Sequence, residues 1–322
     1  MAACAPTAGP GRAATQLASA APADIEAADV REGGTWTRRQ RLKNDLLYVT
    51  ARVALAMVTP LPRAVVRVMC AAMGLLVYAC SPALRARVRQ RLAAGLGATP
   101  EERRVRRAFV TSGLLLADTL SLLDPAEPAK RTLRLTDASR ATFAAAIAER
   151  RGVVFVTAHL GPWERMAALL AAEGFPVATV ARDSYDPRFT RLYQRLRTPR
   201  GVRCLWRGRP GVGKQIVREL RLGRAVGFLI DLPGRSPSIE CPLFGAQSRV
   251  ASGAARMAQS LGAQVLLGTP VPAASGGFEV LIERLDPPAG ATDEGRTRHL
   301  AAALTRRIEA LPEAWVGLFA RG

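Results

Sequence analysis

The chain has 322 residues, of which 49% are hydrophobic and 5% aromatic, and its 46 Lys and Arg against 26 Asp and Glu give a formal net charge of +20. This length and apolar content suffice for one large α/β domain with an extension, or for two domains. The charge predicts a polyanionic partner, but the scarcity of aromatic residues and the absence of zinc-ligand spacing or basic heptads argue against nucleic acid.

Residues 1–35 are rich in Ala, Gly, Thr and Pro and show no apolar periodicity, so they are predicted to form a disordered tail. A basic stretch followed by an apolar core is missing from this segment. A signal peptide is therefore not expected.

Residues 36–130 are predicted to form a membrane-associated helical segment. The apolar stretches 46–58 and 64–80 each contain an arginine, Arg52 and Arg67, which disfavours a clean membrane span. Between residues 36 and 107 the sequence has 15 Lys and Arg but 3 acidic residues, so basic charge lies beside the apolar stretches. This combination favours helices in the interface of an anionic membrane. A soluble helical layer with a solvated basic face is the alternative.

The pattern becomes α/β after Thr99–Glu102, which is read as a capping box that opens a helix through about Leu123. Residues 131–322 are predicted to form a mostly parallel central sheet flanked by helices on both faces. The expected strands are 153–157, 176–180, 202–206, 225–230, 264–269 and 278–284. The expected helices are 138–150, 162–173, 186–197, 212–222, 252–261 and 293–311.

One of the two histidines, His159, directly follows the apolar run 153–157 and begins the sequence His-Leu-Gly-Pro-Trp-Glu. Gly161 and Pro162 suit the start of a helix, so His159 is expected at the carboxyl end of a strand, where chemistry is common in α/β folds. Glu164 is close enough in sequence to orient the imidazole. The pair is typical of a general base with its carboxylate, although this spacing also occurs in ordinary core or rim histidines.

A second motif, Gly208–Lys214, fits the Gly-x4-Gly-Lys of a phosphate-binding loop and follows the expected strand 202–206. Gln215 stands where such a loop needs a Ser or Thr hydroxyl for magnesium, and little chain remains for a nucleotide domain. A nucleotide-binding protein is thus the competing interpretation. A non-catalytic membrane-surface protein is another.

From about residue 40 to residue 321, the chain resembles the lipid A biosynthesis acyltransferases of the lauroyl/myristoyl type, which belong to the lysophospholipid acyltransferase superfamily. The resemblance rests on His159–Glu164, on Arg182 and the segment 197–201, on the strand 223–231 that ends at Asp231, on the turn 242–245, and on 312–315 with Arg321. Leu232 stands where glutamine is common in the family.

The resemblance implies His159 and Glu164 as catalytic residues and no cofactor. No metal site is predicted, because two histidines and no close pair of cysteines leave too few ligands. It implies substrate-binding roles for Gly161, Trp163, Arg182, Arg197, Asp231, Phe244 and Gly245. The donor would be an acyl carrier protein or coenzyme A thioester. The acceptor would be a hydroxyl of a phosphorylated glycolipid such as a lipid A precursor, or of another phospholipid or glycolipid. The protein would lie on the cytoplasmic face of the inner membrane.

Two further features of the sequence agree with this interpretation. The five cysteines are odd in number and scattered, which argues against a disulfide framework and for a reducing location. No Gly-x-Ser-x-Gly elbow exists and no cysteine lies near His159, so direct attack by the acceptor hydroxyl is preferred to an acyl-enzyme route. Arg182, or backbone N–H groups near Gly161, would stabilise the oxyanion.

Overall fold

The computed structural model describes residues 28–29, 34–184, 186–234, 236–288 and 290–320. Most of the tail predicted over residues 1–35 lies outside these residues. Its described part forms two short antiparallel strands, β1 (Ala28–Asp29) and β2 (Gly34–Thr35).

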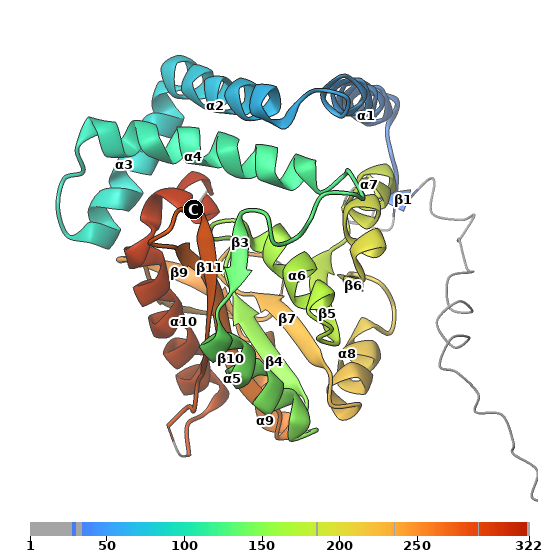
Figure 1. Cartoon of the computed structure of the whole chain (residues 1–322), viewed down its shortest axis with the longest axis vertical. Helices are drawn as coiled ribbons and strands as arrows, with labels where there is room; N and C mark the ends of the chain where they lie inside the picture. The colour runs from blue at the N-terminus through green and yellow to red at the C-terminus, as the bar shows by residue number, and fades with distance from the viewer. Residues whose placement is uncertain (1–27, 30–33, 185, 235, 289, 321–322) are drawn as a thin grey trace, which may run out of the picture.

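Four helices form the segment before the sheet: α1 (Arg38–Val58), α2 (Arg63–Cys80), α3 (Pro82–Leu96) and α4 (Glu102–Ser121). Figure 1 shows α1, α2 and α4 as a layer above the sheet. The capping box predicted at Thr99 is wrong, because α4 begins at Glu102 without a side-chain cap. A capping box forms instead at the start of α1, where Thr37 and Gln40 bond reciprocally.

Two glycines allow α2 and α4 to pack backbone against backbone. A Cβ on Gly74 of α2 would lie 2.3 Å from the carbonyl oxygen of Phe109, and a Cβ on Gly113 of α4 would lie 2.1 Å from that of Cys70. Any larger side chain would separate the helices. One face of α2 is therefore fixed against the body of the protein, and its other face remains exposed.

The remaining chain is an α/β domain around one seven-stranded sheet, as predicted. The strand order is β3-β11-β10-β4-β7-β5-β6, and the pairings from β10 through β6 are all parallel. The strands are β3 (Leu133–Leu135), β4 (Val153–Thr157), β5 (Val177–Arg182), β6 (Arg203–Arg207), β7 (Ala225–Leu229), β10 (Gln264–Pro272) and β11 (Phe278–Arg284).

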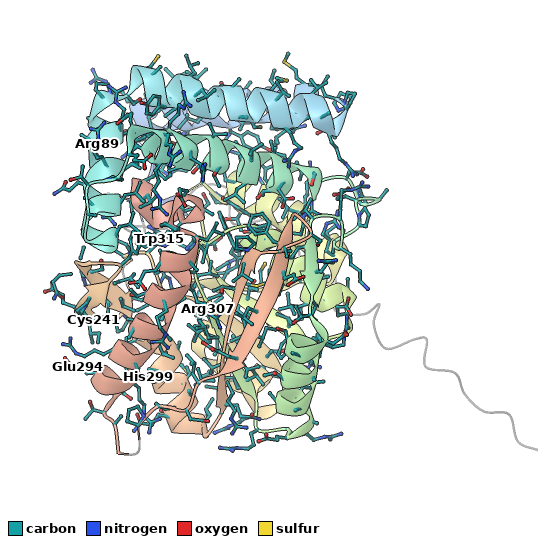
Figure 2. The ribbon with its side chains drawn as sticks, turned by 60° about the vertical axis from the view of Figure 1, so that its left-hand side comes forward. Arg89, Cys241, Glu294, His299, Arg307 and Trp315 are labelled. Carbon is teal, nitrogen blue, oxygen red and sulfur yellow. The ribbon has the colours of Figure 1, made fainter. Side chains whose placement is uncertain are left out.

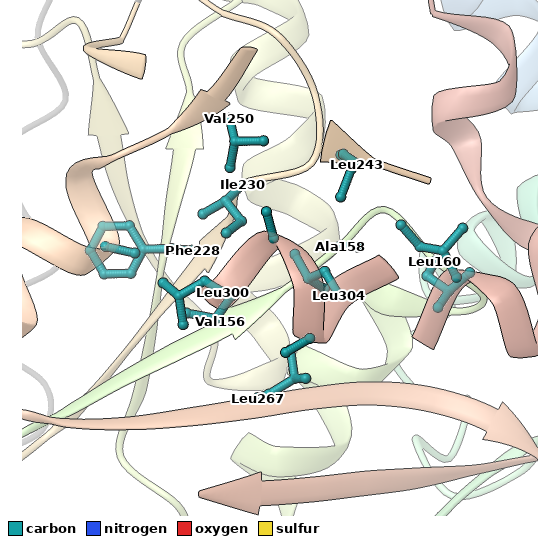
Figure 3. Close-up of a cluster of buried hydrophobic side chains, with 14 of the residues drawn as sticks. Val156, Ala158, Leu160, Phe228, Ile230, Leu243, Val250, Leu267, Leu300 and Leu304 are labelled. Carbon is teal, nitrogen blue, oxygen red and sulfur yellow. The ribbon is translucent and has the colours of Figure 1, made fainter. Parts of the chain in front are cut away.

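Helices cover both faces of the sheet because the central strands are apolar on both sides. Alternate residues of β4 point to opposite faces, and all five are buried. One face packs on α5 (Asp137–Ala148) and α6 (Trp163–Ala172), and the other packs on α8 (Val212–Arg221), α9 (Gly253–Leu261) and α10 (Asp293–Ala310). Figure 3 shows the second core, in which Val156, Phe228 and Leu267 of the sheet meet Leu300 and Leu304 of α10.

Some elements were not predicted. A separate hairpin, β8 (Ser238–Leu243) and β9 (Ala246–Ala251), follows β7, and β11 runs antiparallel to β10. Short half-exposed strands carry little apolar signal, which explains why β3 and this hairpin were missed. The predicted helix 186–197 is present as α7 (Pro187–Arg197). The 3-10 turns η1 (Thr198–Arg200), η2 (Pro312–Ala314) and η3 (Val316–Phe319) complete the described elements.

Candidate active site

His159 lies just after β4, at the carboxyl end of the parallel strands, as its sequence context predicts. Its ring Nδ1 lies 2.9 Å from Oδ1 of Asp231, and its backbone N–H donates to Oδ2 of the same carboxylate at 3.0 Å. Asp231 follows β7, the neighbour of β4 in the sheet. Because the ionised carboxylate accepts from Nδ1, Nε2 is left as the basic nitrogen of the ring.

Trp315 completes the support of Asp231. Its indole N–H donates to Oδ2 of Asp231 at 2.8 Å, and the Asp231 side chain is fully buried. Figure 2 shows Trp315 beyond the end of α10, apart from the other histidine, His299, which lies within that helix. The Asp231 carboxylate thus accepts three hydrogen bonds, one each from the backbone N–H of His159, the His159 ring and the Trp315 indole.

These contacts set the charge states of the pair. Burial opposes protonation of His159, but attraction and hydrogen bonding from Asp231 outweigh it, so the pKa of His159 is raised. Burial also acts to raise the pKa of Asp231, yet attraction to His159 and the three donated hydrogen bonds lower it overall. Asp231 is thus an ionised carboxylate, and the protonated imidazole is stabilised beside it.

Glu164 does not make the hydrogen bond to His159 that its spacing predicted. It lies in the first turn of α6, and its carboxylate accepts from Arg197 of α7, with the Nε to Oε2 distance at 2.9 Å. Both side chains are largely buried, and the carboxylate strongly favours the charged guanidinium, raising the pKa of Arg197 against the effect of burial. Glu164 also acts on His159 through its charge alone, which favours imidazolium.

A cavity of about 600 Å³ opens beside His159, and its lining residues come from both faces of the sheet. Beneath α6 the lining includes Phe155, Leu170 and Gly227. On the other face it includes Ile216 and Phe228. Polar groups gather at the rim, where His159, Glu164, Arg182, Arg197 and Arg207 lie. A reacting group at His159 would therefore have apolar space behind it.

A family model of the bacterial lipid A biosynthesis acyltransferases matches residues 38–321. The chain belongs to this family. It is therefore an acyltransferase, and the matched span includes the helical layer as well as the α/β domain. None of the curated proteins matches the chain.

Of two residues predicted to bind substrate, Trp163 lines the cavity beside His159, whereas Gly161 does not. The Trp163 ring meets the His159 ring edge-on with centroids 5.4 Å apart, and Trp163 lines the cavity. Gly161 does not line it. Its φ of 56° lies in the left-handed region, and its N–H donates to the carbonyl of Ala314, so this N–H is already occupied. Gly161 shapes the turn rather than offering a donor to an oxyanion.

Phe244 and Gly245, predicted to bind substrate, lie in the β8–β9 turn and away from the cavity. Both have positive φ, at 48° and 71°, as a two-residue hairpin turn requires. The Phe244 ring packs edge-on against Trp315 at 5.4 Å, and a Cβ on Gly245 would lie 2.0 Å from the carbonyl oxygen of Ala94. Phe244 thus supports the indole that holds Asp231, and Gly245 allows the turn to lie against the backbone of α3.

Sequence reasoning missed Arg165, which follows Glu164 and is 1% exposed. Its guanidinium bonds to Asp118 and Ser121 of α4 and to the carbonyl of Pro128. An arginine in an apolar helix gives no sequence signal for burial, because arginine is usually exposed. The network ties α6, and with it Trp163 and Glu164, to the helical layer.

The phosphate-loop motif 208–214 joins β6 to α8 at the edge of the sheet. Gly211 precedes α8 with a φ of 77°, and Gln215 lies within the first turn of the helix. Arg209 of the loop pairs with Asp183 at 2.6 Å, and Lys214 is exposed. The loop therefore lies beside the cavity, whose lining includes Val212 of α8.

Proposed function

We propose that this protein moves a fatty acyl group from an acyl carrier protein or coenzyme A thioester to a hydroxyl of a lipid A precursor or related glycolipid, with His159 as general base. The observation that carries the proposal is the His159–Asp231 pair at an apolar cavity, in a chain of the lipid A acyltransferase family. A phospholipid or another glycolipid remains the alternative acceptor.

The reaction follows from the free nitrogen of His159. Nε2 takes the proton of the acceptor hydroxyl as its oxygen attacks the thioester carbonyl carbon. The tetrahedral oxyanion then collapses, the carbon–sulfur bond breaks, and the thiolate leaves with the proton from the imidazolium. Asp231 fixes the ring and stabilises the imidazolium between these two transfers, because it stays ionised and buried.

Stabilising the oxyanion requires a donor at the rim of the cavity. The N–H groups of His159 and Gly161 are already bonded to Asp231 and Ala314. Arg182 ends β5 and lines the cavity, and it is the residue proposed to meet the oxyanion or a phosphate of the substrate. Arg197, which is paired with Glu164, also lines the cavity and is proposed to contact the substrate.

The apolar cavity is proposed to hold the fatty chain. On the α6 side of the sheet, Thr179, Gly227 and Phe155 lie in one row across β5, β7 and β4. Gly227 has no side chain, and Phe155 leans over Gly268, where a Cβ would lie 2.0 Å from its ring. This leaves a space over Gly227, and Leu170 of α6 forms the opposite wall of the cavity there. Burial of each methylene there contributes about 0.8 kcal/mol to donor binding.

The helical layer is proposed to lie on the cytoplasmic face of the inner membrane. No residue of α1 is buried, and α1 and α2 expose large apolar side chains: Leu42, Leu46, Leu47, Val49, Val53, Met57, Val65, Val68, Met69, Met73, Leu75 and Leu76. Among the described helices, α2 is long and apolar enough to cross a membrane. Its packing along α4 through Gly74 and Gly113 favours an interfacial position instead.

In the proposed arrangement the membrane would lie near the cavity, because α1 contacts a helix that lines it. Tyr48 of α1 packs edge-on against Phe189 of α7 at 5.9 Å, and Arg188 of α7 bonds Asp45 of α1. Helix α7 also supplies Tyr193 and Arg197 to the cavity lining. A glycolipid lying in the membrane would therefore meet the rim with its head group, while its own chains stay in the bilayer.

The test is acyl transfer by the purified protein from an acyl thioester to a lipid A precursor, followed by mass spectrometry of the lipid. The expected product is heavier than the acceptor by one acyl chain, and a chelator has no effect. A phospholipid acceptor in a parallel reaction decides between the two acceptor classes. Transfer to neither would overturn the proposal. Micromolar binding of ATP that is lost in Lys214→Ala would favour the nucleotide-binding interpretation instead.

A further inference from the structure

Thr157, the last residue of β4, carries a buried hydroxyl beside the catalytic histidine. Thr157 is 4% exposed, and its Oγ1 has no hydrogen-bond partner among the residues that the structure describes. It lines the cavity that opens beside His159. Buried hydroxyls are normally hydrogen-bonded, because one without a partner costs free energy. The cavity is therefore where a bound molecule can supply the partner of this hydroxyl.

Thr157 and His159 point to the same side of the sheet. Alternate residues of a strand point to opposite faces, and Val156 and Ala158 belong to the core that packs on α10 (Figure 3). The residues between and beyond them therefore face α6, as does Phe155 further along the strand. Thr157 thus lies between the histidine and the apolar part of the cavity beneath α6.

The spacing of the two side chains suits a thioester bound between them. Two residues of an extended strand span about 6.6 Å. An acceptor oxygen bonded to Nε2 of His159 and a carbonyl oxygen bonded to Oγ1 of Thr157 each take up about 3 Å. The carbonyl carbon joins these two oxygens when the acceptor attacks. A plain fatty chain would leave the hydroxyl unpaired, whereas every acyl thioester brings a carbonyl oxygen.

Other donors close to the histidine already have partners. The backbone N–H groups of His159 and Gly161 donate within the protein. Each of the three guanidinium nitrogens of Arg197 also has a partner, since Nε and Nη2 bond Glu164 and Nη1 bonds Cys204. The threonine hydroxyl, in contrast, remains available to a substrate.

Arg182 begins on the other side of the sheet. Thr179 of β5 lies in the row that faces α6, and Arg182 is three residues further along the same strand. Alternation therefore directs its side chain to the face of α8, where Ile216 also lines the cavity. That position suits a phosphate of the substrate better than a carbonyl oxygen beside His159.

We propose that Thr157 is a further catalytic residue, whose hydroxyl donates a hydrogen bond to the thioester carbonyl oxygen and to the oxyanion that forms from it. The inference rests on the proposed function and assigns its oxyanion donor. As the acceptor oxygen bonds to the carbonyl carbon, one electron pair of the carbonyl double bond moves to its oxygen, and the Thr157 hydroxyl stabilises that charge while keeping its proton. The pair returns when the carbon–sulfur bond breaks.

The test is steady-state acyl transfer by Thr157→Val, which replaces the hydroxyl by a methyl group of similar size. The value of kcat should fall by about 10²–10³, as for the loss of one oxyanion donor, with little change in KM for the donor. Thr157→Ser keeps the hydroxyl and should recover much of the rate. Thr269→Val on the adjacent strand β10 is the matched control, because the Thr269 hydroxyl is also buried and without a partner in the described part of the chain, but lies outside the cavity lining.

A second measurement separates catalysis from folding. Valine removes the cost of burying an unpaired hydroxyl, so the denaturation midpoints of Thr157→Val and Thr269→Val should equal or exceed that of the wild type. A slow Thr157→Val protein that is as stable as the wild type is not explained by a structural role of the threonine.

A third measurement identifies the partner of the hydroxyl by comparing a plain acyl donor with a 3-hydroxyacyl donor of the same chain length. Equal losses of kcat with both donors support the carbonyl oxygen as the partner. A loss confined to the 3-hydroxyacyl donor, wild-type kcat in Thr157→Val, an equal loss in Thr269→Val, or a serine variant as slow as the valine variant would overturn the inference and leave the proposed function standing. No transfer by the wild type from either donor would refute the proposed function, and this inference with it.

Discussion

At the scale of single residues, the site depends on a buried carboxylate that is held ionised. Asp231 accepts hydrogen bonds from the His159 ring, the His159 backbone and Trp315, and the cost of burying its charge is offset by these donors and by the imidazole. The carboxylate fixes the tautomer in which Nε2 is basic. It also raises the pKa of His159, which strengthens the base and sets the pH at which it is neutral.

The first prediction concerns pH. A general base must be neutral to accept a proton, so kcat/KM should fall as pH decreases through the pKa of His159, and the inflection should lie above the ordinary imidazole value of 6.5. Asp231→Asn removes the charge that raises this pKa, so the remaining activity should have its inflection at lower pH. The measurement is kcat/KM against pH for both proteins, and an unmoved inflection would show that Asp231 does not act on His159.

The second prediction concerns Glu164 and Arg197. Glu164→Gln leaves the Arg197 guanidinium buried without its carboxylate, and breaking such a pair costs about 3–5 kcal/mol. The free energy of unfolding should therefore drop, as measured by denaturant titration. Glu164→Gln/Arg197→Gln should recover part of the loss, because no unpaired charge remains. A double variant less stable than the single one would mean that the pair is not the cause.

The sequence predicts the position of His159 in the site but not which carboxylate forms the hydrogen bond with it. His159 follows an apolar strand and stands before a Gly-Pro helix start, so its place at the sheet edge follows from local sequence. Glu164 was expected to bond it because the two lie five residues apart. Asp231 is 72 positions away in the chain and reaches His159 because β7 pairs with β4. The order of strands in a sheet leaves no local signal in a single sequence.

At the level of secondary structure, strand β7 contributes both to the catalytic pair and to the cavity. Its end presents Asp231 to the histidine, and its middle residue, Gly227, opens the cavity beneath α6. The strongly apolar strands and amphipathic helices of the α/β domain were predicted within one to three residues of their observed ends. The β8–β9 hairpin was not, since Pro242 interrupts its first strand, three of the six residues of its second strand are polar, and it packs against α10 rather than joining the main sheet.

The third prediction uses the gap at Gly227. A Cβ there would lie 3.5 Å from Cγ2 of Thr179, an ordinary contact, so Gly227→Ala and Gly227→Val should fold. The added carbons point into the cavity and should shift the preference toward shorter acyl chains, more in the valine variant. Competition between donors of different chain length, read by mass spectrometry of the product, measures the shift. An unchanged preference would place the fatty chain elsewhere, and the lobe lined by Ile216 and Phe228 would be the next candidate.

At the scale of the whole molecule, charge and apolar surface are divided between regions. The outer side of the helical layer exposes the large apolar side chains of α1 and α2, whereas the exposed cations Lys214, Arg218 and Arg221 of α8 lie away from that layer (Figure 1). The net charge of +20 is thus spread over more than one surface. Composition predicts a polyanionic partner, and only the arrangement of the elements shows where the exposed apolar side chains and the cations lie.

The fourth prediction tests the membrane surface. The protein should sediment with anionic vesicles, and high salt should weaken this binding without abolishing it, since burial of apolar side chains is little screened. Replacing Leu42, Leu46 and Met57 of α1 by glutamine should release it, because these side chains are 72%, 66% and 67% exposed and support no core. Arg306→Glu on α10 is a control for nonspecific charge effects. Equal sedimentation of the glutamine variant would contradict the interfacial position of α1.

We propose that His159 acts as the general base of acyl transfer and that Asp231 acts through it. The most direct measurement is kcat/KM for His159→Ala, Asp231→Asn and the double variant, with far-ultraviolet circular dichroism to confirm folding. His159→Ala should lower the rate by about 10²–10⁴, and the double variant should be little worse than His159→Ala, because the two residues act as one unit. Near-normal turnover in folded His159→Ala, or fully additive losses, would contradict these roles of His159 and Asp231.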